Sequence, residues 1–198
     1  MRKYLIVLAG LPGTGKTTLA KKLIKNLGDF ELIDQNELRR IDGMKKMPKK
    51  QDRILRQIDR MAAEFLNNNR GVIVDSVHRY GFRRQQLYGV ASACGTEVLL
   101  IECVCSSREA KKRMMARFKS DGLLSDPNNT KVYDKLANLW EDVITYDFKY
   151  HGSDHVSYIT YNSETNQIKA KILQHSMKQD FNMIKDLLVG EKNELLQK

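Results

Sequence analysis

One octapeptide, GLPGTGKT at residues 10–17, constrains the fold of this chain more than any other stretch. It follows an apolar run at 4–9, which is short, rich in branched side chains and therefore typical of a buried strand. After it, Leu19, Leu23 and Leu27 recur at helical spacing. The pattern G-x-x-x-x-G-K-[ST] between a strand and a helix is the setting that a phosphate-binding loop requires. The alternative is a glycine-rich turn that merely joins a strand to a helix.

The residue types in this stretch suit a polyphosphate ligand. Glycines allow turns and a close backbone approach that a Cβ would block, and successive N–H groups then form a nest for anions. The start of the following helix adds the positive end of its dipole. We expect Lys16 to reach the outer phosphates of a nucleoside triphosphate such as ATP, and the Thr17 hydroxyl to hold Mg²⁺. The full set of residues expected to bind the triphosphate is Gly10, Gly13, Thr14, Gly15, Lys16, Thr17 and Thr18.

The length and composition predict one soluble domain over residues 1–198. Lysines and arginines outnumber acids by 34 to 24, and the net charge of +10 favours an anionic partner such as a nucleotide or a nucleic acid. A lysine-rich solvated surface would give the same sum. Three cysteines without C-x-x-C spacing indicate free thiols in a reducing compartment. The apolar start is far too short for a membrane span or a signal sequence, so we expect a cytoplasmic protein with no membrane partner.

Apolar periodicity predicts strands and helices in alternation, which indicates an α/β domain with a parallel sheet and ligands at the carboxyl ends of its strands. After the first strand and helix, strands are expected at 30–34, 72–75, 97–104 and 155–161. Helices are expected at 35–40, 54–65, 79–93, 108–119 and 131–149, followed by a last helix carrying Ile168 to Leu188 and a frayed tail after Gly190.

The stretch from Arg39 to Arg53 is strongly basic and is broken by Gly43 and Pro48, so an exposed loop is expected there. Two interpretations remain open for it. It is either a solvated surface or a strip that contacts an anionic substrate.

Two aspartates end predicted strands. Asp75 closes an apolar strand, where a carboxylate can support Mg²⁺ beside Thr17, and its alternative role is that of a turn former. Asp34 closes the second strand, where a carboxylate could accept a proton from an attacking hydroxyl. Its alternative role is that of a helix N-cap, with Glu37 completing a capping box.

Arg113 and Arg117 are four residues apart and share one face of a basic helix that precedes a Gly- and Asp-rich interruption. Arginines bordering such a loop can offset charge in phosphoryl transfer, so residues 108–130 are interpreted as an arginine-bearing lid. The alternative is a solvated basic face. The four histidines, including His78, show no metal-ligand spacing and are treated as incidental.

Several segments together resemble the small P-loop kinases related to polynucleotide kinase and the zeta-toxin kinases. They are GLPGTGKTT at 10–18, NELRR at 36–40, VIVDSVHRYGFRR at 72–84, REAKKRMMAR at 108–117 and LSDP at 124–127. The resemblance implies a three-layer P-loop NTPase fold with a five-stranded parallel sheet in the order 2-3-1-4-5, flanked by helices. It also implies that Arg39 binds substrate, that Asp75 is the second acidic residue and that Arg117, supported by Arg113, is the lid arginine. The position of the family's catalytic base holds Asn36, which cannot take up a proton, so Asp34 or Glu37 would have to substitute.

The sequence therefore favours an ATP-dependent phosphotransferase that moves the γ-phosphate of Mg-ATP to a hydroxyl, on a nucleic-acid 5′ end or a small metabolite. Its catalytic residues would be Lys16, Asp34, Arg113 and Arg117. The alternative is a nucleotide-dependent switch or nucleic-acid-binding ATPase with no phosphorylated product. A third interpretation is a structural domain whose loop is vestigial.

Overall fold

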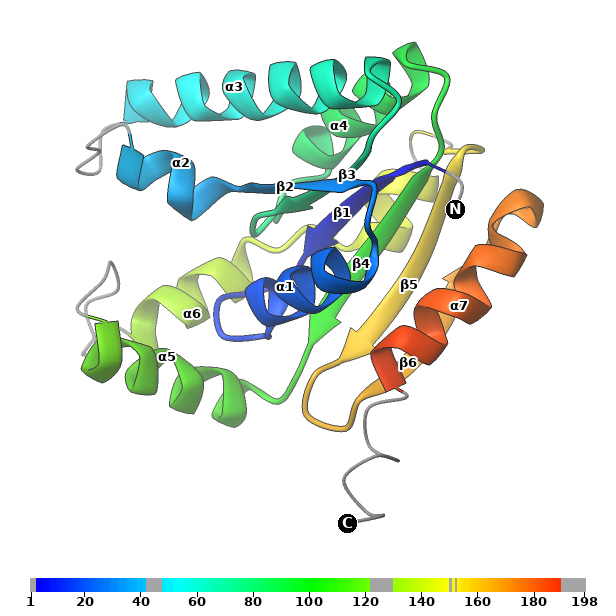
Figure 1. Ribbon diagram of the computed structural model, residues 1–198. Helices are drawn as coiled ribbons and strands as arrows, with labels where there is room; N and C mark the ends of the chain where they lie inside the picture. The colour runs from blue at the N-terminus through cyan, green and yellow to red at the C-terminus, as the bar shows by residue number, and fades with distance from the viewer. Residues whose placement is uncertain (1–2, 42–47, 122–129, 150, 152, 190–198) are drawn as a thin grey trace.

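A computed structural model describes residues 3–41, 48–121, 130–149, 151 and 153–189 of this chain (Figure 1). The LSDP segment at 124–127, the tail after Gly190 and the centre of the basic stretch at 42–47 lie outside the described residues.

The centre of the fold is a six-stranded sheet in the order β2-β3-β1-β4-β5-β6. The first five strands in this order run parallel to their neighbours, and β6 runs antiparallel to β5. The predicted order 2-3-1-4-5 is confirmed, and β6 is a sixth strand that the sequence did not predict. The strands are β1 Leu5–Ala9, β2 Phe30–Asp34, β3 Gly71–Asp75, β4 Val98–Val104, β5 Val156–Asn162 and β6 Gln167–Ile172.

Helices cover both faces of the sheet (Figure 1). On one face pack α1 Lys16–Asn26 and α7 Lys178–Val189, and on the other α3 Pro48–Asn67 and α4 Gly81–Ala93. Side chains alternate between the two faces along β1, where Val7 faces α3 and α4 while Ile6 and Leu8 face α1. Burial on both faces explains why the strand is apolar at every position.

Further helices lie beyond the carboxyl ends of the strands. They are α2 Gln35–Ile41, α5 Ser107–Asp121 and α6 Thr130–Asn138, the last two lying together at the lower left of Figure 1. Ser106 caps α5, because its Oγ accepts a hydrogen bond of 3.2 Å from the Glu109 N–H. These elements bring polar side chains to the edge of the sheet where the phosphate-binding loop begins.

The predicted last helix is wrong over its first turns, where the chain forms β6. Ile168 and Ile172 are four residues apart, and this spacing fits one face of a strand as well as one face of a helix. The turn before β6 carries the missed signal: Asn162 Oδ1 accepts the N–H groups of Glu164 (2.9 Å) and Thr165 (3.2 Å), and Asn166 adopts φ +56°.

Two other helix boundaries also differ from the prediction. The helix expected at 131–149 ends at Asn138 and resumes as a π-helical segment, η1 Ile144–Lys149, whose start Asp142 caps through a 2.8 Å bond from the Thr145 N–H. The expected loop from Arg39 to Arg53 is helical from Pro48 onward, since proline suits the first position of a helix. Among the described residues, no helix is long and apolar enough to cross a membrane.

Candidate functional site

The loop between β1 and α1 is built on three glycines with positive φ: +140° at Gly10, +80° at Gly13 and +92° at Gly15. A Cβ at Gly10 would lie 2.3 Å from the Cys103 carbonyl oxygen, and one at Gly13 would lie 2.3 Å from the Ala110 carbonyl oxygen. These positions therefore exclude side chains for both conformational and steric reasons.

The Lys16 side chain curls back over this loop and is only 8% exposed. Its ammonium donates hydrogen bonds of 2.9 Å to the carbonyl oxygens of both Gly10 and Leu11. The Thr14 hydroxyl braces the same turn by donating to the Leu11 carbonyl at 2.8 Å. The ammonium is thereby held at the β1 end of the loop, which marks where it could meet the outer phosphate of a bound nucleotide.

Asp34 and Asp75 end neighbouring strands in register with each other, and Asp75 is also in register with Leu8 of β1. Asp75 is 2% exposed, and Asp34 is half-buried. Asp34 Oδ1 accepts the N–H of Asn36 at 2.7 Å, so the residue does cap α2. This bond uses one of its two oxygens and therefore does not exclude a second role.

Arg39 follows in α2 and is half-buried. Burial lowers the pKa of its guanidinium, while the nearby Asp34 charge raises it. The structure thus brings together two of the predicted site residues, Asp34 and Arg39, beside Asp75 at the end of β3.

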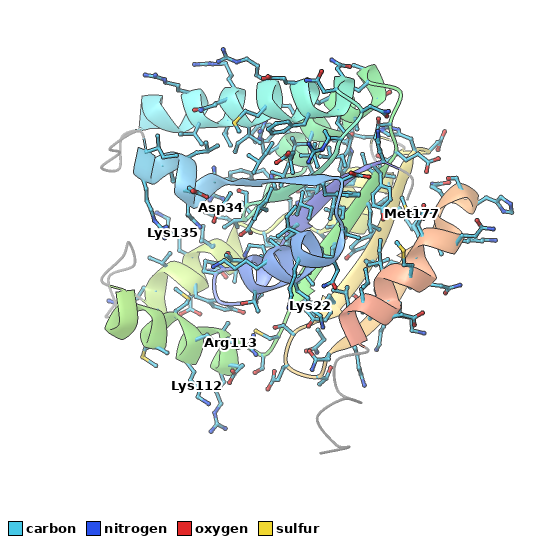
Figure 2. The ribbon with its side chains drawn as sticks, viewed as in Figure 1. Lys22, Asp34, Lys112, Arg113, Lys135 and Met177 are labelled. Atoms are coloured by element: carbon cyan, nitrogen blue, oxygen red, sulfur yellow. The ribbon has the colours of Figure 1, made fainter. Side chains whose placement is uncertain are left out.

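Arg113 lies elsewhere, at the α1 end of the loop (Figure 2). Its guanidinium donates to Glu109 Oε1 (2.8 Å) and to Ser163 Oγ (2.7 Å), and it lies 3.7 Å from the position of a Cβ on Gly15. It borders a cavity of about 450 Å³, whose lining includes Gly15, Thr18, Lys22, Ser163 and Asn166. The side chain of Arg117 lies outside the described residues, so the lid role of both arginines stays a prediction.

A smaller cavity of about 120 Å³ borders the first part of the loop and shares no lining residue with the larger one. Gly10, Leu11 and Thr14 form one side of it, the end of β4 from Glu102 contributes a second, and Tyr133 and Trp140 complete it. The Tyr158 hydroxyl donates a hydrogen bond to Glu102 Oε2. Burial raises the pKa of the Glu102 carboxyl, whereas this hydrogen bond and Arg84 lower it.

His78 contacts the end of β1, just before the loop, although it was treated as incidental in the sequence. Its Nδ1 lies 2.8 Å from the Leu8 carbonyl oxygen, and the carbonyl of the preceding Val77 accepts the Gly10 N–H at 3.1 Å. Burial lowers the pKa of His78 to about 3, so the ring is neutral and Nδ1 donates. The residue adopts φ +46°, a left-handed conformation that is uncommon outside glycine and that His, Asn and Asp adopt more often than other residues. Its place within VIVDSVHRYGFRR, shortly after Asp75, was the available signal.

Arg84 is fully buried and forms a bidentate ion pair with Asp147 of η1, with contacts from 2.7 to 3.0 Å. It also donates to the backbone carbonyls of His78 and Glu141, and the Tyr88 hydroxyl donates to the same aspartate. These bonds hold the segment after α6 against α4, so the role of Arg84 is structural.

A glycine-rich cradle between β1 and α1, a buried lysine at its β1 end and acidic strand ends on a parallel sheet together define a P-loop NTPase fold. Residues 5–139 match the sequence profile of the AAA domain family. The match covers most of the chain, which therefore belongs to this family. No curated protein sequence matches the chain significantly.

Solved structures with similar folds include P-loop kinases. APE1195 aligns over 94% of this chain and 97% of its own at 20% identity and a TM-score of 0.64. Kti12 from Chaetomium thermophilum, in complex with ADP-AlF3, aligns over 93% and 99% at 20% identity and a TM-score of 0.62. A gluconokinase from Sinorhizobium meliloti 1021 aligns over 98% and 97% at 14% identity and a TM-score of 0.54. These similarities establish the shared fold.

Proposed function

We propose that this protein is an ATP-dependent phosphotransferase that moves the γ-phosphate of Mg-ATP to a hydroxyl group. The observation that carries the proposal is the loop itself, with three positive-φ glycines and the buried Lys16 ammonium at its β1 end. Such a loop presents backbone N–H groups to a polyphosphate. The full-length similarity to a gluconokinase supports a kinase with a compact single domain.

Mg²⁺ fits this site as an ion that arrives with the nucleotide. The described residues contain no group of three or more His, Cys, Asp or Glu that could hold a metal on its own. Mg²⁺ prefers oxygen ligands and is usually held by one or two protein oxygens together with phosphates and water. Thr17 and Asp75 would hold the ion, which would neutralise charge on the phosphates.

The other residues of the site have roles in the proposal that follow from their positions. Lys16 leaves the carbonyls of Gly10 and Leu11 for the outer phosphates when nucleotide binds. Asp34 uses its second oxygen to orient the acceptor, which Arg39 contacts. Arg113 contacts the nucleotide beside the cavity of about 450 Å³, where the nucleoside lies. Arg117 stabilises the transferring phosphoryl group.

Two observations favour a second candidate, a nucleotide-dependent switch or ATPase without a phosphorylated product. Asn36 stands where the resembling kinases carry a base, and Kti12 shares this fold and is known in complex with ADP-AlF3. The two candidates differ in where the γ-phosphate goes.

Radiolabel transfer from γ-labelled ATP separates them. The phosphotransferase predicts label on an organic acceptor, whereas the switch predicts label only in free phosphate. Lys16→Ala should remove either activity, because charge stabilisation by the loop lysine is lost, while circular dichroism should show an intact fold. Wild-type turnover in Lys16→Ala would contradict both candidates.

A further inference from the structure

The two cavities border different parts of the phosphate-binding loop and share no lining residue. The larger one touches Gly15, Thr18 and Arg113, where α1 begins. The smaller one touches Gly10 and Leu11, whose carbonyls hold the Lys16 ammonium. Phosphoryl transfer needs the attacking and leaving oxygens roughly in line across the transferred group. A nucleoside in the larger cavity therefore places the attacking hydroxyl at the end of the loop where the smaller cavity opens.

The walls of the smaller cavity select against a strongly anionic acceptor. Of the described residues that line it, none is a lysine or an arginine, and its one carboxyl group belongs to Glu102. Tyr133 and Trp140 supply aromatic surface, which suits stacking on a sugar or another compact ring. Its volume of about 120 Å³ is below the range of about 300–1,000 Å³ usual for whole-ligand pockets, so it fits the reacting end of an acceptor or a very small molecule.

Glu102 is placed to contact a hydroxyl in this cavity. It is in register with Ala9, the residue before Gly10, so its carboxyl group emerges beside the start of the loop. Tyr158 donates to Oε2 and holds the carboxyl in place, and among the described residues Oε1 accepts no hydrogen bond. An oxygen in this position can accept a hydrogen bond from an acceptor hydroxyl.

We propose that the smaller cavity is the acceptor site, that its substrate is a small uncharged hydroxyl compound such as a polyol or sugar, and that Glu102 Oε1 takes the hydroxyl proton. The inference rests on the proposed phosphotransferase function. It places both the acceptor and its base at β4, and it replaces the acceptor roles given above to Asp34 and Arg39 at the end of β2, where Asp34 caps a helix.

The acceptor oxygen forms a bond to the γ-phosphorus as the bond from that phosphorus to the β–γ bridging oxygen breaks, and ADP leaves with the bridging electron pair. The hydroxyl proton passes to Glu102 Oε1 and then to solvent. A carboxyl whose pKa burial has raised is a stronger proton acceptor than an exposed one.

The test uses the full chain with γ-labelled Mg-ATP and four probes: glycerol, D-ribose, myo-inositol and an oligothymidylate with a free 5′-hydroxyl. We expect label on one or more of the three uncharged compounds.

Glu102→Gln tests the base. The glutamine has the same shape, and its side-chain oxygen can still accept the hydrogen bond from Tyr158. The substitution should lower kcat by about 10²-fold or more, while the calorimetric Kd for Mg-ATP should stay within about threefold of wild type. The acid limb of the wild-type kcat/KM profile should disappear in Glu102→Gln. Trp140→Leu should raise KM for the acceptor.

Glu97→Gln is the matched control. Glu97 immediately precedes β4, at the amino-terminal end of the strand and so at the opposite end from the loop. It is half-buried and also accepts a hydroxyl hydrogen bond, from Ser176 at 2.5 Å. Its transfer activity should match wild type. The inference fails if Glu102→Gln transfers label within about threefold of wild type, if it loses Mg-ATP binding, or if the oligonucleotide alone is labelled. Free phosphate as the only labelled product of the wild-type protein would contradict the proposed function itself.

Discussion

At the scale of single residues, the structure gives structural roles to side chains that the sequence analysis did not select. His78 is the clearest case. It follows the end of β3 in a left-handed backbone conformation, and its ring donates a hydrogen bond to the Leu8 carbonyl of β1. Its burial makes protonation unfavourable in the folded state, with a pKa of about 3 against an ordinary value of 6.5. The unfolded chain therefore binds a proton in this interval that the folded chain does not.

Linkage sets the sign of the resulting pH dependence. Between pH 3 and 6.5 the His78 contribution to the unfolding free energy should increase with pH, by at most about 1.4 kcal/mol per unit. His78→Asn tolerates the same backbone conformation and should remove this contribution, so the wild-type advantage should grow from pH 4 to pH 7. Urea unfolding of both proteins across this range measures it. A constant difference would show that His78 titrates equally in both states.

Gly13→Ala tests the loop itself. A methyl group there meets the Ala110 carbonyl oxygen at 2.3 Å, and φ is +80°. We expect a loss of about 1–3 kcal/mol in unfolding free energy and no calorimetric binding of Mg-ATP. Gly89→Ala is the control, because no atom lies within 4 Å of its added Cβ inside α4. It should stabilise the protein by about 0.5–1 kcal/mol and bind nucleotide normally.

At the scale of elements, one buried ion pair holds the segment after α6 against α4. Arg84 and Asp147 are both fully buried, and Tyr88 donates to the same carboxylate. Removing one partner leaves an uncompensated buried charge. The position of Trp140, which lines the proposed acceptor cavity 5.8 Å from the Arg84 guanidinium, depends on this packing.

Asp147→Ala should therefore lower the unfolding free energy by about 3–5 kcal/mol, as measured by urea denaturation. The comparison is Arg70→Ala, which breaks the exposed pair with Glu31 and should cost less than about 1 kcal/mol. Equal losses in the two variants would contradict a special role for burial.

The elements also show what the sequence could and could not predict. β1 is apolar throughout, β3 is apolar up to Asp75 and β4 up to Glu102, so their strand character and the loop that follows β1 were readable from the residues alone. The sheet order came from family resemblance. β6 was missed because Ile168 and Ile172 fit two periodicities, and Glu102 was missed because its partner Tyr158 is on a different strand, far away in sequence.

At the scale of the whole molecule, nucleotide binding and folding should be linked, since a cradle made from β1, α1 and the end of β3 exists only in the folded chain. Mg-ATP at about 100 times its Kd should add about 2.7 kcal/mol to the unfolding free energy. Calorimetric melting with and without Mg-ATP measures the gain, and Lys16→Ala should show little of it. An unchanged wild-type melting temperature would contradict a functional loop.

The strand that completes the sheet also has a consequence for behaviour in concentrated solution. β6 is the last strand of the order and carries Lys169 and Lys171, both exposed. Two copies meeting edge to edge along β6 would bring these ammonium groups into mutual repulsion. This repulsion should disfavour aggregation through pairing of exposed β6 strands. Replacing the two lysines with threonine should therefore make the protein precipitate at lower concentration.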